Sequence, residues 1–299
     1  MKDVLIAAMQ QDRQAAERLS IEMNVPASPI TLQKFPDRES KVTATQAGRV
    51  TILYASLEQP DEKLIPLIFA ASALRDLGAE KIILVAPYLC YMRQDKAFHD
   101  GEAVSQQVLA KILSPWIDEI VTVEPHLHRV ADFSAVFPDI KAIALSAAPL
   151  LAALVNNGEG SKNILLIGPD QEARAWTKAV AEASQAPFVI MTKQRRGDRD
   201  VEVVIDDAVK VEGREIYLVD DVVSSGATLA AATVVLKQKG AARIEALAVH
   251  ALCSNDDLIR LKEAGLSRLR STDTVSHETN AISATPLLAD ALGKEFADL

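Results

Sequence analysis

Three short apolar runs, each followed by a segment with helical periodicity, constrain the fold of this chain more than any other feature. The runs are Val50–Ala55, Ile164–Ile167 and Ile216–Val219. The segments with helical spacing are residues 62–77, 172–183 and 228–239. Continuous apolar strands that alternate with amphipathic helices are typical of parallel sheets covered on both faces. We therefore predict an α/β protein.

The two halves of the chain share the same signals for the end of a helix and the start of the next strand. A helical pattern ends at Gly78 in the first half and at Gly240 in the second, and a strand pattern begins two or three residues later. Internal duplication and independent use of the same signals both explain this. With 299 residues, 49% of them hydrophobic, the chain can form two domains. We predict domains over 1–143 and 144–285, and a closing amphipathic helix over 286–299 that packs on the N-terminal half.

Charge and apolar content exclude several classes of protein. The formal net charge of −9 opposes binding to a nucleic-acid duplex, which needs a basic surface. No apolar run approaches the roughly 20 residues of a membrane span, and the first residues lack a secretion signal. Cys90 and Cys253 are far apart and are expected to be reduced thiols. We predict a cytoplasmic protein without nucleic-acid or membrane partners.

The segment Ile216–Leu229 carries the clearest chemical signal. An apolar strand ends in Asp220 and Asp221, and a loop of small residues then opens directly into a helix. Backbone N–H groups and the dipole at such a helix start favour a phosphate. The side chains that can add hydroxyl donors are Ser224, Ser225 and Thr228. The carboxylates suit sugar hydroxyls or a metal bound to diphosphate, so the pair favours a phosphoribosyl site over an ordinary helix cap.

Two polar clusters follow other predicted strands. Residues 93–96 (Arg-Gln-Asp-Lys) come after a strand that ends near Ala86, where ligands gather in open α/β sheets. Residues 193–199 (Lys-Gln-Arg-Arg-Gly-Asp-Arg) follow a strand over 188–191. They suit a flap that closes on a polyanion, although a solvated basic turn explains the composition equally well. His126 and His128 alone are a weak metal signal.

Taken in order, these motifs resemble the ribose-phosphate pyrophosphokinases, or phosphoribosyl-diphosphate synthetases, over nearly the whole chain. The motifs are Phe35-Pro36-Asp37-Arg38-Glu39, the segment 87–96, Val123-Glu124-Pro125-His126, Gly168-Pro169-Asp170 and the loop 216–228. The shorter archaeal-type members are most similar. The resemblance implies two phosphoribosyltransferase-like domains, each a mostly parallel sheet flanked by helices. It also implies a transferase that moves diphosphate from ATP to the anomeric hydroxyl of ribose 5-phosphate.

The resemblance also implies roles for individual residues. The positions that match ATP binding are Phe35, Asp37, Glu39, Arg93, Gln94, Asp95 and His126. The first three belong to a loop that reaches the site of a neighbouring subunit, which implies a homo-oligomer. Lys193 and Arg195 match the catalytic positions of the flap, and His126 and Asp170 match magnesium-binding positions. The positions that match ribose 5-phosphate binding are Asp220, Asp221, Ser224, Ser225, Gly226, Ala227 and Thr228.

The ribose-phosphate loop departs from the family pattern. Ser224 replaces a third carboxylate, Ser225 replaces a threonine and Ala227 replaces a glycine. Ala227 fits only if its φ is negative. An ordinary synthetase, a related enzyme with another phosphopentose and a non-catalytic regulatory homologue are all compatible with Ser224. A plain phosphoribosyltransferase would keep the loop but would have no use for the ATP motifs of the first half.

Overall fold

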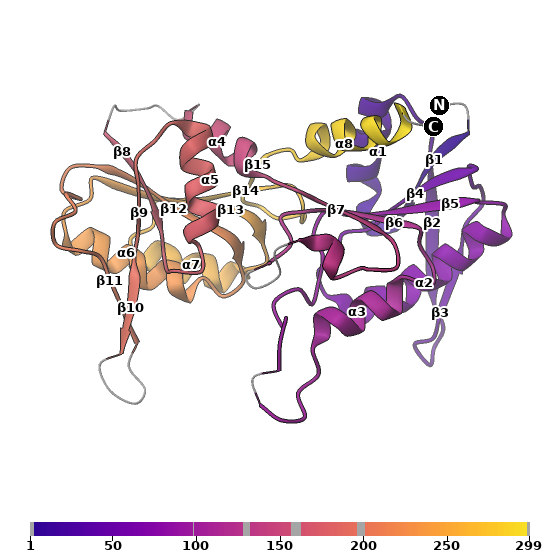
Figure 1. Cartoon of the computed structure of the whole chain (residues 1–299), viewed down its shortest axis with the longest axis horizontal. Coiled ribbons are helices and arrows are strands. Elements are labelled where there is room, and N and C mark those ends of the chain that lie inside the picture. The colour runs from indigo at the N-terminus through magenta and orange to yellow at the C-terminus, as the bar shows by residue number, and fades with distance from the viewer. Residues whose placement is uncertain (1–2, 98, 128–131, 157–162, 196–200, 298–299) are drawn as a thin grey trace. The chain divides into compact units, whose positions relative to one another are not determined.

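A computed structural model describes residues 3–97, 99–127, 132–156, 163–195 and 201–297. The chain forms two compact units, one of Met1–Leu145 with Ala284–Leu299 and the other of Ser146–Ser283 (Figure 1). The second unit is therefore an insertion in the first. The Asn- and Gly-rich segment 156–161, whose composition predicts a surface turn, lies outside the described residues from residue 157 on, and so does the end of the basic flap, 196–199. His128 lies outside them as well.

The first unit contains a sheet in the order β3-β2-β1-β4-β5-β6-β7, in which only the β2–β3 pair of the described strands is antiparallel. Its strands are β1 Val4–Met9, β2 Ala27–Lys34, β3 Ser40–Thr43, β4 Val50–Tyr54, β5 Lys81–Ala86, β6 Glu119–Val123 and β7 Lys141–Leu145. Its helices are η1 Gln10–Asp12, α1 Arg13–Met23, α2 Pro60–Asp76, α3 Ser105–Leu113, η2 Phe133–Ala135 and α8 Thr285–Ala297.

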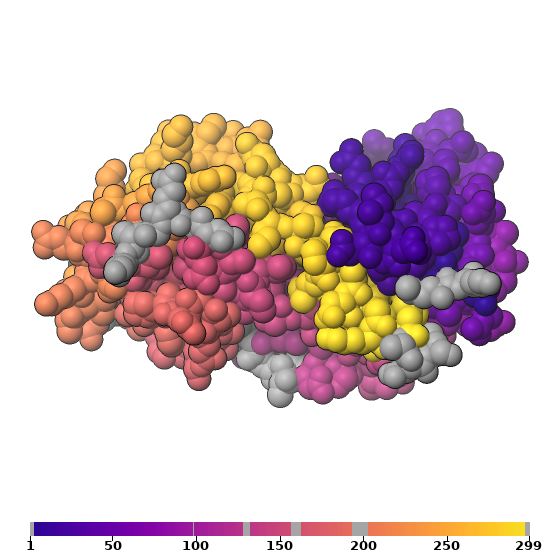
Figure 2. Space-filling model, turned by 90° about the horizontal axis from the view of Figure 1, so that it is seen from above, coloured from indigo at the N-terminus to yellow at the C-terminus, as the bar shows by residue number. Residues whose placement is uncertain are grey.

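Helices cover both faces of this sheet. Figure 1 shows α1 and α8 on one face and α2 and α3 on the other. Every residue of β1, β4 and β6 is buried, which is why these strands are continuous apolar runs rather than alternating ones. Helix α8 packs on α1 (Figure 2) and buries Leu288 and Leu292, and Glu295 on α8 forms an ion pair with Lys141 of β7.

The second unit has a parallel sheet in the order β15-β14-β13-β12-β8-β9 and a separate antiparallel hairpin, β10–β11. Its strands are β8 Ile164–Gly168, β9 Phe188–Ile190, β10 Thr192–Arg195, β11 Val201–Val204, β12 Glu215–Val223, β13 Arg243–Ala251, β14 Arg268–Thr272 and β15 Asn280–Ile282. Its helices are α4 Ala148–Asn156, α5 Arg174–Ser184, α6 Ala227–Gln238 and α7 Asn255–Ala264. Figure 1 shows α6 and α7 together on one face.

The two sheets share one connection order. Leaving out β3, the first reads β2-β1-β4-β5-β6-β7 and the second reads β9-β8-β12-β13-β14-β15, so each strand has a counterpart in the other unit. In both units an antiparallel pairing follows the second strand: β3 pairs with β2 in the first unit, and β10 pairs with β11 after β9 in the second. This common strand order favours internal duplication over two halves that acquired the same helix-end and strand-start signals independently. The predicted α/β fold with two mostly parallel sheets flanked by helices is confirmed.

The predicted elements exist, with shifted ends. The strand predicted over 216–219 continues to Val223, because Asp220 pairs with Ala248 and Val222 with His250 on β13. The helix predicted from residue 172 begins at Arg174. None of the helices in the described ranges is long and apolar enough to cross a membrane.

Candidate active site

The loop between β12 and α6 lies at the carboxyl edge of the second sheet, where ligands collect in open α/β folds. Gly226 precedes α6 with φ +68°, and a Cβ on it would lie 3.0 Å from Leu261 Cδ1. Both the left-handed backbone and the close side chain require glycine here. Ala227 is the first residue of α6, so its φ is negative and the condition set by the sequence is met.

The two carboxylates of β12 are held by the backbone. Asp220 Oδ1 accepts a hydrogen bond from the N–H of Asp221 at 3.0 Å, and Asp221 Oδ1 accepts one from the N–H of Val222 at 2.8 Å. Burial, followed by the charges of Asp221 and Asp170, raises the pKa of Asp220 well above its usual value. Negative charge is therefore concentrated at this edge, where hydroxyl donors or a cation would relieve it.

Asp170 joins this carboxylate group from the end of β8. Its Oδ1 accepts hydrogen bonds from the N–H groups of Glu172 (3.0 Å) and Ala173 (3.3 Å), which fixes the carboxylate just before α5 begins. Gly168 allows this turn, because a Cβ there would lie 2.6 Å from Ile190 Cδ1. In the Gly-Pro-Asp motif, Gly168 thus leaves room for Ile190, and Asp170 places a carboxylate at the start of α5.

The carboxylates at this edge are of the type that binds magnesium, but few of them are close together. Carboxylate oxygens are the ligands that Mg²⁺ prefers, and it keeps several waters. The raised pKa of Asp220 is a sign of charge that a cation would offset. No group of three or more His, Cys, Asp or Glu within the described ranges is arranged to hold a metal by itself. His126 belongs to the first unit and Asp170 to the second, so their joint role stays a prediction.

The predicted ATP residues of the first unit lie after β5 and β6. Ser105 Oγ donates to Gln94 Oε1 at 2.6 Å, and the Gln94 carbonyl accepts from the N–H of Gln106 at 3.3 Å, so Gln94 is fixed at the start of α3. Arg93 is exposed, and Asp95 is half-buried. His126 is half-buried and follows the end of β6. These residues share the carboxyl edge of the first sheet.

Phe35 sits in the tight turn between β2 and β3. Its N–H donates to the Glu39 carbonyl at 2.9 Å, its carbonyl accepts from the N–H of Arg38 at 2.9 Å, and Asp37 Oδ1 accepts from the N–H of Glu39 at 3.1 Å. The Phe35 ring is 50% exposed. An exposed ring on a braced turn can stack on a planar base, although Asp37 is accounted for by the turn itself.

Lys193 and Arg195 lie on β10, opposite Val203 and Val201 of β11. The catalytic role of the predicted Lys-x-Arg pair stays a prediction.

Some polar residues escaped the sequence analysis. His250 and His277, which the sequence leaves as structural or surface residues, are structural: His250 hydrogen-bonds with Thr274, and His277 with the Cys253 carbonyl, partners that the sequence did not show. Asp12 gave no signal in the sequence and is only 8% exposed. Its 3-10 helix η1 packs on β2, a contact that the sequence pattern does not reveal.

Comparison with known proteins supports the expected resemblance. The family description "N-terminal domain of ribose phosphate pyrophosphokinase" matches residues 4–115, and "phosphoribosyl transferase domain" matches residues 137–284. Ribose-phosphate pyrophosphokinases of Methanobrevibacter smithii and Methanopyrus kandleri are 31% and 30% identical to the chain. The alignments cover 93% and 97% of this chain, and 96% and 98% of those proteins.

A solved structure has the same fold. The crystal structure of phosphoribosylpyrophosphate synthetase from Mycobacterium smegmatis matches 99% of this chain and 100% of its own, with a TM-score of 0.85 and 22% identity. Both halves are thus matched separately by family descriptions and together by full-length relatives. The chain belongs to the ribose-phosphate pyrophosphokinase family.

Proposed function

We propose that this protein is a ribose-phosphate diphosphokinase that forms phosphoribosyl diphosphate and AMP from ATP and ribose 5-phosphate. The observation that carries the proposal is the β12–α6 loop, in which two carboxylates precede a left-handed Gly226 and the open start of α6. This loop offers acceptors for a sugar and donors for its phosphate on one short segment. The membership of the chain in the family supports ATP as the second substrate.

The loop divides the recognition of ribose 5-phosphate between its two ends. The 5-phosphate binds at the N-terminus of α6, where free N–H groups, Ser225 and Thr228 donate hydrogen bonds. Asp220 and Asp221 accept hydrogen bonds from ribose hydroxyls. Ser224 stands beside the sugar without the third carboxylate, which supports a second candidate: an enzyme of the same class with another phosphopentose acceptor.

ATP binds through the first unit in this proposal. Gln94, fixed at α3, hydrogen-bonds the nucleotide, and Arg93 and His126 contact the phosphates. The ring of Phe35, with Asp37 and Glu39, reaches the nucleotide of a neighbouring subunit, so the enzyme is a homo-oligomer. ATP and ribose 5-phosphate are metabolites of the cytoplasm, where the enzyme acts.

The transfer itself depends on position and charge. The anomeric oxygen attacks the β-phosphorus of ATP, the bond from this phosphorus to the α–β bridging oxygen breaks, and AMP leaves with that oxygen while the hydroxyl proton passes to solvent or base. Lys193 and Arg195 place positive charge over the phosphates when the hairpin closes. His126 and Asp170 would hold Mg²⁺, which supplies further positive charge to the polyphosphate.

The deciding measurement is AMP and phosphoribosyl-diphosphate formation by the purified protein with ATP, Mg²⁺ and ribose 5-phosphate. A folded protein, checked by circular dichroism, that releases no AMP at millimolar substrates would refute the proposal and favour a non-catalytic homologue. Ribose 5-phosphate tested beside other phosphopentoses identifies the acceptor.

Lys193→Ala tests the flap. We expect turnover to fall by at least about 100-fold, because a transition-state donor is lost, while ATP binding measured by calorimetry remains. Lys210→Ala, which removes an exposed lysine between β11 and β12, is the matched control and should keep full activity. Near-normal turnover of the Lys193 variant would show that Lys193 is not a catalytic residue.

A further inference from the structure

Both ring nitrogens of His277 form hydrogen bonds. The backbone N–H of Thr279 points to Nδ1 at 3.3 Å, and Thr279 Oγ1 lies 2.8 Å from the same atom. An N–H donor requires Nδ1 to be an acceptor, so the ring proton of neutral His277 is on Nε2. Nε2 lies 2.8 Å from the carbonyl oxygen of Cys253, to which this proton is donated.

The neighbouring thiol does not explain this geometry. Cys253 Sγ is 3.9 Å from Nε2, farther than the carbonyl oxygen. Burial raises the pKa of Cys253, so the thiol stays protonated and the pair lacks the thiolate of a reactive cysteine. The contact that orients His277 is therefore the one to the Cys253 backbone.

The backbone beside Cys253 is tied to the ribose-phosphate loop. The N–H of Leu252 donates to the carbonyl oxygen of Val223 at 2.8 Å, and Val223 directly precedes Ser224. A short path of two hydrogen bonds thus leads from the His277 ring to Val223, the residue directly before the loop.

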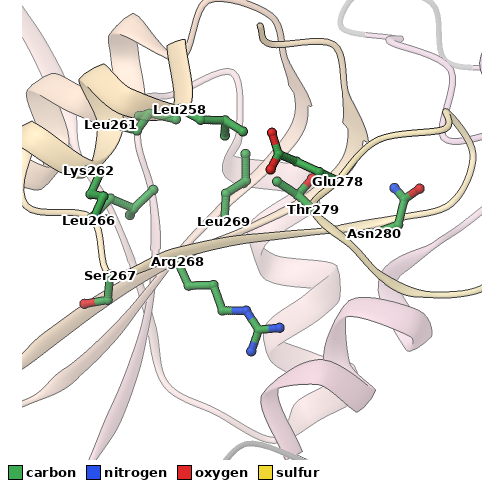
Figure 3. A pocket seen from close by; sticks show the side chains of 10 residues that line it. All are labelled: Leu258, Leu261, Lys262, Leu266, Ser267, Arg268, Leu269, Glu278, Thr279 and Asn280. Atoms are coloured by element: carbon green, nitrogen blue, oxygen red, sulfur yellow. The ribbon is translucent and has the colours of Figure 1, made fainter. Parts of the chain in front are cut away.

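A second path runs through α7. Ser254 caps the start of this helix with a reciprocal capping box to Asp257. Leu261, about two turns after Ser254, is the side chain that lies against Gly226. Figure 3 shows Leu261 on α7 and Thr279 on the facing segment, both lining one pocket. Segment 252–254, which His277 holds, therefore also sets the start of the helix that supports Gly226.

We propose that His277 is a positioning residue for the ribose 5-phosphate loop, acting through the hydrogen bond from Nε2 to the Cys253 carbonyl. The role rests on the proposed function of the β12–α6 loop. His277 touches no substrate in this account. It fixes the segment that holds the backbone on both sides of the phosphate cradle, whereas the predicted ATP residues belong to the other unit.

Two amide substitutions separate the nitrogens of the ring. In His277→Gln the amide nitrogen reaches the place of Nε2 and can still donate to the Cys253 carbonyl. In His277→Asn the shorter side chain reaches only the place of Nδ1. We expect the Asn variant to raise KM for ribose 5-phosphate about fivefold, the effect of one lost hydrogen bond, with KM for ATP unchanged. The Gln variant should stay within about twofold of the wild type.

A second readout does not need turnover. Hydrogen exchange of the backbone amides over 224–228 should accelerate in the Asn variant and remain slow in the Gln variant. If the Asn variant does not fold, Thr279→Val removes the hydroxyl at Nδ1, and it should give the same selective rise in KM with a smaller size of about twofold.

The outcomes distinguish this inference from the proposed function. A wild-type protein without diphosphokinase activity refutes the function, whatever the variants do. An active wild type whose Asn and Gln variants have equal KM values for ribose 5-phosphate overturns the positioning role. An equal rise in KM for both substrates overturns it too, because it would show a general loss of structure.

Discussion

Replacing Asp12 by asparagine should remove a loss of stability that the first unit undergoes as pH rises from about 4 to about 7. Asp12 ends η1 and is 8% exposed, and its Oδ2 has no hydrogen-bond partner in the part of the chain that the structure describes. The charge of Lys63 lowers the pKa of Asp12, but Lys63 Nζ donates to the Ser56 carbonyl at 2.8 Å and pairs with Glu58. Asp12 is thus a buried carboxyl whose negative charge is poorly balanced.

The pKa gives the size and the sign of the effect. Burial, opposed by the charge of Lys63, raises the pKa of Asp12 from 3.8 to about 7. Between these values the folded protein binds more protons at Asp12 than the unfolded chain, so the contribution of Asp12 to stability is fully present below pH 4 and is lost as pH rises through 7. At roughly 1.36 kcal/mol per pH unit, the ionised group costs about 4 kcal/mol in full, of which about 2.5 kcal/mol develops between pH 5 and pH 8.

The measured quantity is the difference in unfolding free energy between Asp12→Asn and the wild type. It should shift by about 2.5 kcal/mol in favour of the variant between pH 5 and pH 8. Because the two units can unfold separately, urea unfolding is followed by Trp116 fluorescence in a Trp176→Phe background. Trp116 then reports the first unit alone, since the chain has two tryptophans.

Glu22→Gln, an exposed carboxyl on the adjoining helix α1, is the matched control and should show no such pH-dependent difference. A difference for Asp12→Asn that stays constant within about 0.5 kcal/mol from pH 5 to pH 8 would contradict the burial argument. It would mean that the folded protein keeps Asp12 ionised with adequate compensation.

Two further substitutions test the carboxyl edge of the second sheet. Gly168→Ala places a Cβ 2.6 Å from Ile190 Cδ1 and 2.7 Å from Thr177 Oγ1. We therefore expect the free energy of unfolding of the second unit to fall by about 1–3 kcal/mol, as measured by urea unfolding with Trp176 fluorescence. An unchanged midpoint would show that the turn after β8 relaxes freely. Ser224→Asp restores the carboxylate that the family pattern has, and KM for ribose 5-phosphate should fall about fivefold at constant KM for ATP. A rise in that KM would show that Ser224 suits this chain's own acceptor.

The parts of the fold that sequence predicted well are those with local signals. The strand that ends in Asp220 is continuous and apolar because both faces of the sheet are covered, and this pattern is visible in a single segment. Its end was placed too early, since two carboxylates normally stop an apolar run. Pairing with β13 carries the strand on to Val223, which only the tertiary structure reveals.

The side chains that sequence missed depend on distant partners. Asp12 stands in a polar stretch that reads as a surface helix start, but η1 packs on β2, and the Ser56 backbone and the charge of Lys63 act on its carboxylate from distant parts of the sequence. His277 stands in another polar stretch, and its carbonyl partner, Cys253, lies 24 residues away. Burial and tautomer are set by these contacts, so neither follows from local periodicity or composition.

The placement of α8 has a consequence for synthesis of the chain. The first unit is interrupted after Leu145 and resumes at Ala284, so its polypeptide is incomplete while the whole second unit is being made. During that interval α1 lacks the surface formed by Leu288 and Leu292, which are almost fully buried afterwards. Domains usually fold from the N-terminus as they emerge. Here the inserted unit, although made later, has all its residues first, and the unit that begins the chain is completed last.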